Sequence, residues 1–197
     1  MRPTEKLIRE HDAILTMLKI LDRAVGASNS GDGTKVNDLR KMVDFLSGFA
    51  DGCHHAKEEG YLFPALEQAG IPREHGPIGV MLAEHDLGRK YVKGMHEALD
   101  GAQRGEKFSQ HRLAFTMNAR AYANLLKAHI EKENNVLFPM ADVALTEERQ
   151  LELSKAFERL EAEKIGAESH EALYAVLRDL CGTYLSKAHP SAPDIQD

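Results

Sequence analysis

Several classes of protein are excluded by what this chain of 197 residues lacks. It has no tryptophan, and cysteine occurs only at Cys53 and Cys181. There is no C-x-x-C pair, which excludes a zinc ribbon and a thioredoxin-type redox site. Two cysteines cannot form a disulfide scaffold, and such low usage favours a reducing, cytoplasmic location.

Basic charge and long apolar runs are also scarce. Lys and Arg number 25 against 31 Asp and Glu, which gives a net charge of -6. We therefore expect no nucleic-acid partner, because nucleic-acid binding requires a basic surface. No run of about 18 apolar residues occurs, and the first residues, MRPTEKLIREHD, do not form a signal sequence. We expect no association with a membrane.

Helical periodicity dominates what is present, and no alternating strand pattern competes with it. Apolar residues recur at threes and fours along four long segments, and two shorter helical segments follow. Four long helices with short connectors favour antiparallel packing. The sequence predicts an all-α fold: an up-down-up-down four-helix bundle with two additional C-terminal helices.

The expected boundaries come from capping residues and prolines. Thr4 is a candidate N-cap for the first helix, and Pro64 and Pro139 are expected to end the second and fourth helices. The predicted organisation is a bundle over residues 1–145, a C-terminal helical extension over 146–187 and a disordered tail over 188–197.

Two stretches of the chain repeat one pattern. Residues 54–64 read HHAKEEGYLFP and residues 129–139 read HIEKENNVLFP, so both contain H-x-x-K-E-x-x-x-L-F-P. The tripeptide EHD also occurs twice, at 10–12 and 84–86. Each half of the bundle therefore contains EHD on one helix and the longer motif on the next.

The repeated positions carry metal-binding chemistry. A histidine and a glutamate four residues apart share one face of a helix, about 6 Å apart along its axis. In an antiparallel bundle, the histidine of each EHD lies level with these pairs. The candidate ligands are four imidazoles and two carboxylates: His11, His54, Glu58, His85, His129 and Glu133.

Six such side chains are too many for one tetrahedral zinc ion and suit two octahedral ions. By symmetry, His11 with His54 would hold one ion and His85 with His129 the other, and the two glutamates would bridge them. Mixed nitrogen and oxygen ligands suit iron, manganese or zinc. A single H-x-x-x-E pair is often only an exposed stabilising pair. Its duplication favours metal binding, because burying these groups without a partner costs several kcal/mol each.

Other members of the repeat allow more than one interpretation. Glu10 and Glu84 are expected either at the surface or in support of the ligands. Lys57 and Lys132 are expected to extend to water. His55 has two interpretations: a seventh, asymmetric ligand, or an exposed histidine beside Glu59.

These motifs resemble those of the hemerythrin-like (hemerythrin HHE cation-binding) family over roughly residues 4–145. The resemblance implies a non-haem di-iron centre with an oxo or hydroxo bridge. Oxygen-carrying hemerythrins have a further histidine one turn after the third-helix ligand, where this chain has Arg89. They also have an aspartate where this chain has Glu133. His55 restores the histidine count if it binds metal.

Three functions follow from this resemblance. The first is binding of a small diatomic ligand, O2 or NO, for storage, delivery or sensing. The second is an enzyme acting on peroxide, NO or O2, and the third is iron handling or iron sensing. Manganese and zinc are the alternatives to iron. The C-terminal helices are expected to cover the bundle, to extend it or to form a homodimer contact.

Overall fold

The computed structural model describes residues 1–29, 35–103, 107–164 and 166–185, and all of its regular elements are helical. The all-α prediction is confirmed for this part of the chain, where no strand occurs. The elements, in chain order, are α1 (Pro3–Asn29), α2 (Val36–Phe45), η1 (Leu46–His55), η2 (Glu58–Leu62), α3 (Phe63–Gln68), α4 (Pro77–Gln103), α5 (Phe108–Lys132), η3 (Glu133–Leu137), α6 (Phe138–Ala144), α7 (Glu147–Lys164) and α8 (Gly166–Tyr184).

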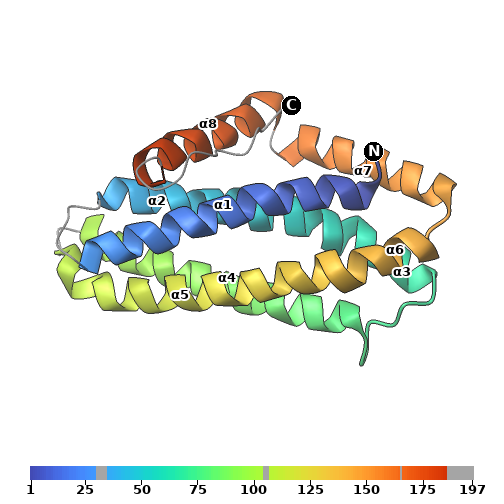
Figure 1. Cartoon of the computed structure of the whole chain (residues 1–197), viewed down its shortest axis with the longest axis horizontal. Coiled ribbons are helices and arrows are strands. Elements are labelled where there is room, and N and C mark those ends of the chain that lie inside the picture. The colour runs from blue at the N-terminus through green and yellow to red at the C-terminus, as the bar shows by residue number, and fades with distance from the viewer. Residues whose placement is uncertain (30–34, 104–106, 165, 186–197) are drawn as a thin grey trace.

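The long helices lie side by side along the long axis of the molecule (Figure 1). Helix α4 packs extensively on α5, and α1 contacts both α5 and η1. The two C-terminal helices lie along one side, where α7 contacts α1, η1 and η2, and α8 contacts α1 and α2. Among the described helices, none is long and apolar enough to cross a membrane.

Apolar side chains form two buried clusters along the bundle. The larger includes Ile14 of α1 and Leu177 of α8, and the smaller includes Leu7 of α1 and Phe157 of α7. His11, which is fully buried, lies on α1 between the residues that enter the two clusters. A polar layer therefore separates two apolar regions, and the C-terminal helices contribute to both.

The predicted helix ends at Pro64 and Pro139 are wrong. Helical structure continues to Gln68 and to Ala144, because a π-helical turn precedes each proline. In each half the phenylalanine before the proline donates its backbone N–H five residues back, to the carbonyl of Glu58 or of Glu133. Each proline then falls in the first turn of a new α-segment, where its missing N–H costs little.

The predicted N-cap is also wrong. Helix α1 already includes Thr4, and its hydroxyl donates to Asp142 Oδ1 of α6 at 2.7 Å. Pro3 opens the helix, a position that suits proline's fixed φ. The predicted disordered tail lies outside the described residues.

Candidate metal centre

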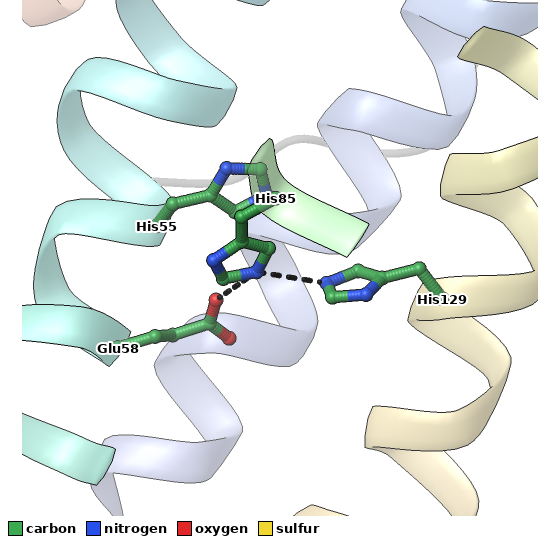
Figure 2. Close-up of side chains that lie close together, drawn as sticks. All are labelled: His55, Glu58, His85 and His129. Atoms are coloured by element: carbon green, nitrogen blue, oxygen red, sulfur yellow. Dashed lines mark hydrogen bonds and ion pairs between the residues drawn. The ribbon is translucent and has the colours of Figure 1, made fainter. Parts of the chain in front are cut away.

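All seven candidate ligands are buried, and the structure brings them into two groups that share one glutamate. The first group consists of His11, His54, Glu58 and Glu133. The second group consists of His55, Glu58, His85 and His129 (Figure 2). In each group the ligand atoms lie within 4.8 Å of one another.

Both carboxylates face the two groups at once. Glu58 directs Oε1 to His54 Nε2 at 3.4 Å and Oε2 to His85 Nε2 at 3.5 Å. Glu133 directs Oε2 to His11 Nε2 at 3.2 Å and Oε1 to His129 Nε2 at 3.2 Å. Each glutamate thus has one oxygen for each group, which is the geometry of a bridging ligand.

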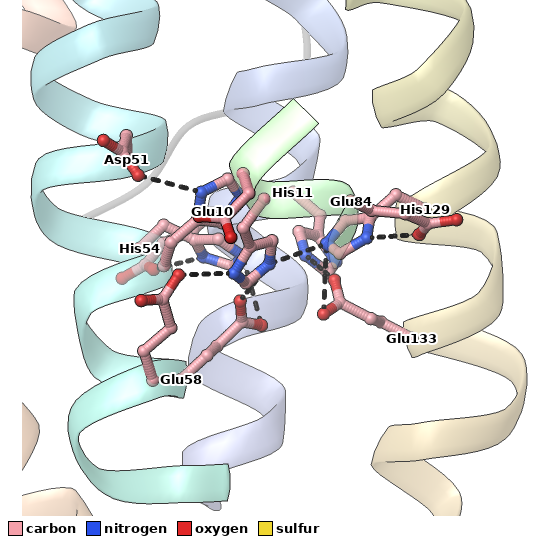
Figure 3. A network of polar contacts seen from close by, with 12 residues as sticks. Glu10, His11, Asp51, His54, Glu58, Glu84, His129 and Glu133 are labelled. Carbon is pink, nitrogen blue, oxygen red and sulfur yellow. Dashed lines mark hydrogen bonds and ion pairs between the residues drawn. The ribbon is translucent and has the colours of Figure 1, made fainter. Parts of the chain in front are cut away.

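The outer nitrogens of two histidines are held by the glutamates of the EHD motifs. Nδ1 of His54 donates to Glu10 Oε2 at 2.8 Å, and Nδ1 of His129 donates to Glu84 Oε2 at 2.9 Å (Figure 3). Of the two roles expected for these glutamates, the structure shows the supporting one. A carboxylate here fixes the tautomer and raises the basicity of Nε2.

The other two outer nitrogens are held by the residues directly after Glu58 and Glu133. Nδ1 of His85 donates to Glu59 Oε1 at 2.7 Å, and Nδ1 of His11 donates to Asn134 Oδ1 at 2.8 Å. These roles of Glu59 and Asn134 are not among the predictions from sequence. A usable signal exists, since each follows the repeated glutamate by one residue.

Seven buried polar atoms of these ligands have no hydrogen-bond partner: Nε2 of His11, His54 and His55, and both oxygens of Glu58 and Glu133. Because the Nδ1 atoms of His11 and His54 donate outward, their Nε2 atoms present lone pairs, as do the carboxylate oxygens. Converging lone pairs buried without a donor cost several kcal/mol. The residues present therefore fit cations, and this mixed donor set suits iron, manganese or zinc.

The carboxyl groups of Glu58 and Glu133 have pKa values shifted in opposite directions. Burial, with Glu133 close by, raises the pKa of Glu58 well above its ordinary value. Burial also acts to raise the pKa of Glu133, but contacts with His11 and His129 outweigh it and hold that pKa well below the ordinary value. The pair is thus suited to carry one proton without a cation and none with cations bound.

Burial sets the protonation of most of the ligand histidines. It lowers the pKa values of His54, His55 and His85, so these rings are kept neutral. His129 differs, because its contacts with Glu133 and Glu84 outweigh burial and raise its pKa.

His55 is buried, so its interpretation as an exposed histidine is wrong. Its ring stacks on that of His85 with centroids 3.8 Å apart, and its Nδ1 lies 3.4 Å from Asp51. The expected partner, Glu59, instead contacts His85 and Arg89. His55 is therefore placed to join the second group, although its outer contact is the longest among these histidines.

The two motif lysines differ. Lys57 is fully buried between Glu10 and Glu161, so the expectation that it extends to water is wrong. Lys132 contacts Glu84, and 41% of its side chain remains exposed, as expected. The role of Glu161 on α7 had no signal in the sequence, because α7 lies outside the repeat.

A pocket of about 250 Å³ reaches the second group from the surface between η1, α4 and α5. Arg89 lies beside it, where oxygen-carrying hemerythrins have a histidine, and its guanidinium binds Asp51, Glu59 and Asp86 at 2.8, 2.5 and 3.0 Å. The pocket is lined by Ser47, Asp51, His55, His85, Gly88, Arg89, Val92, Lys93, His96 and Tyr122.

Phenylalanines of the two L-F-P motifs border the centre. Phe63 stacks on His85 with centroids 5.9 Å apart, and Phe138 stacks on His11 at 5.4 Å. These rings keep water from one side of each group.

Comparison with known proteins agrees with this geometry. An uncharacterized protein of Mycobacterium tuberculosis is 25% identical over 191 residues, which cover 95% of this chain and 73% of that protein. The iron-sulfur cluster repair protein YtfE of Edwardsiella ictaluri is 30% identical over 133 residues, 68% of this chain and 60% of that protein. No solved structure matches the chain. The hemerythrin HHE cation binding domain matches residues 2–141, and the chain therefore belongs to that family.

Proposed function

We propose that the chain is a non-haem di-iron protein built on an up-down-up-down four-helix bundle. One iron would be held by His11 and His54 and the other by His85, His129 and His55, with Glu58 and Glu133 bridging. The observation that carries the proposal is the set of buried Nε2 and carboxylate atoms without hydrogen-bond donors. Cations bound between them would offset the cost of burying these atoms.

Binding of O2 or NO is the function that this geometry supports best. Iron, when bound, supplies reversible redox chemistry and affinity for diatomic molecules. The protein contributes a dry site, and Tyr122, Gly88 and Val92 form an apolar approach to the second group. A small neutral molecule can follow this route because the charge of Arg89 is already met by three carboxylates.

The experiment is an anaerobic iron titration followed by optical spectroscopy. We expect two irons per chain, and visible absorption that appears on adding O2 or NO to the ferrous protein and fades when the gas is removed. Irreversible oxidation would contradict reversible binding of O2 and would direct assays to turnover of peroxide, NO or O2. Binding of no metal would overturn the proposal.

Iron handling is a second candidate, favoured by the similarity to proteins described as iron-sulfur cluster repair proteins. With sulfide added in both cases, it predicts that the ferrous protein rebuilds the cluster of an acceptor that has lost it, faster than free iron of equal concentration does. Recovery of the acceptor's cluster absorption measures this. Equal recovery with free iron would exclude the second candidate.

A further inference from the structure

In both groups a series of contacts runs from a histidine to a glutamate and then to a lysine. Beyond the lysine the two groups differ. In the second group, His129 contacts Glu84 and Glu84 contacts Lys132, where the series ends at the surface. In the first group the matching series is His54, Glu10 and Lys57, and it continues into the C-terminal region.

Helix α7 supplies that continuation. Glu161 directs Oε1 to Lys57 Nζ at 2.5 Å and Oε2 to Lys6 Nζ at 2.6 Å. The four charges alternate in sign from Glu10 to Lys6 and join α1, the segment between η1 and η2, and α7. Glu161 lies beyond residues 2–141, which match the family.

Lys57 needs the contact with Glu161 because its ammonium group is buried. A fully buried ammonium with a single counter-ion is poorly compensated, and the second carboxylate completes its neutralisation. Helix α8 packs on α1, which carries Glu10, and its Tyr174 meets Phe49 of η1 edge-on with centroids 5.6 Å apart. Neither α7 nor α8 covers Lys132, and 41% of its side chain remains exposed.

We propose that α7 acts as a clamp on one of the two metal positions. Glu161 is a positioning residue: it fixes Lys57, Lys57 fixes Glu10, and Glu10 orients His54. The first group therefore holds its ion longer than the second group, and ion binding in turn stabilises the docking of α7, since such coupling is reciprocal. This inference rests on the proposed di-iron centre.

The test measures iron release from the ferrous protein to an excess of a coloured chelator. We expect two phases of equal amplitude in the natural sequence. Glu161→Gln should accelerate the slow phase about tenfold, the lower end of what loss of a ligand-supporting contact costs, and leave the fast phase unchanged. Glu84→Gln should instead accelerate the fast phase.

Glu158→Gln is the matched control, because it makes the same change on an exposed position of α7. It should release iron as the natural sequence does. A single release phase in the natural protein, or equal effects of the Glu161 and Glu158 variants, would overturn the clamp. Two bound irons with either result would leave the di-iron proposal standing, whereas failure to bind iron would remove both.

Hydrogen exchange supplies a readout that does not depend on iron release. Iron should slow amide exchange along α7 in the natural protein and in Glu158→Gln, and this protection should be reduced in Glu161→Gln. Equal protection by iron in all three proteins would show that α7 docks independently of the metal position, and would contradict the coupling.

Discussion

Glu58 and Glu133 occupy matching positions, yet their surroundings shift their pKa values in opposite directions. Glu133 lies 3.2 Å from Nε2 of His11 and of His129, which hold its pKa well below the ordinary value against the effect of burial. Burial, and then the nearby Glu133, raise the pKa of Glu58 well above that value. Glu58 keeps its proton to higher pH in the folded chain than in the unfolded chain. Raising the pH from about 4.5 through its folded pKa therefore removes folding free energy from the metal-free protein.

Replacing each glutamate by glutamine should separate these roles. Glu58→Gln should raise the unfolding free energy of the metal-free protein at pH 7 by roughly 1 kcal/mol, because it removes a poorly compensated acid. Glu133→Gln should lower it by roughly 3 kcal/mol, because a buried charged contact is broken. Urea unfolding in the presence of a chelator measures both.

Iron should reverse the stabilising effect of Glu58→Gln. With metal bound, both variants should be less stable than the natural protein, since each has lost a bridging oxygen. Equal stability changes for the two variants without metal would contradict the opposite pKa shifts of Glu58 and Glu133.

The histidine assignments have a direct test. His54→Ala and His129→Ala should each bind less iron per chain, by up to one ion, because each ring belongs to a different group. His96→Ala, at the pocket lining away from both groups, should retain the full amount. Elemental analysis measures the content, and unchanged metal in both variants would refute the site.

The candidate ligands could be named from sequence, but most of their hydrogen-bond partners could not. A duplicated motif on a helix face specifies which side chains point inward, and six ligands follow from it. Spacing of four residues shows only that two groups share a face. Glu59 shares the face of His55 but contacts His85 on another helix, because packing between helices decides the partner.

At the scale of elements, the π-helical turns explain the errors in the predicted boundaries. Helical periodicity assumes a constant turn, and proline normally ends it. Here η2 begins at Glu58 and η3 at Glu133, and each widens the turn before the proline. Such turns are frequent at functional sites, but an alternation of apolar and polar residues does not reveal them.

Helix α7 is an integral part of the fold, and its core contact is testable. Phe157 is fully buried and meets Tyr61 edge-on at 6.4 Å. Phe157→Ala should lower the unfolding free energy by about 3–5 kcal/mol. Leu151→Ala on the exposed face should change it by no more than about 0.5 kcal/mol. Urea unfolding of the two variants, each with its full iron content, measures the difference. Similar losses of unfolding free energy in both variants would contradict a docked α7.

For the molecule as a whole, the two sides of the centre have different access. Helix α7 covers Lys57 on the side of the first group, and the second group borders the pocket beside α4. A ligand that enters from solvent through this pocket therefore reaches His55 and His85 of the second group before it reaches the first group. Sequence symmetry between the two halves could not predict this, since the covering helix lies outside the repeat.

Narrowing the pocket should slow ligand binding without removing iron. Val92 is buried in the pocket wall, so Val92→Phe should reduce the association rate of NO with the ferrous protein about tenfold, a barrier of about 1.4 kcal/mol. Lys93→Ala, at the exposed rim, should not slow it. Stopped-flow absorption measures both rates, with iron content as the check on the site. An unchanged rate in Val92→Phe would show that the ligand reaches the iron by another route, because an obstruction matters only along the path that is used.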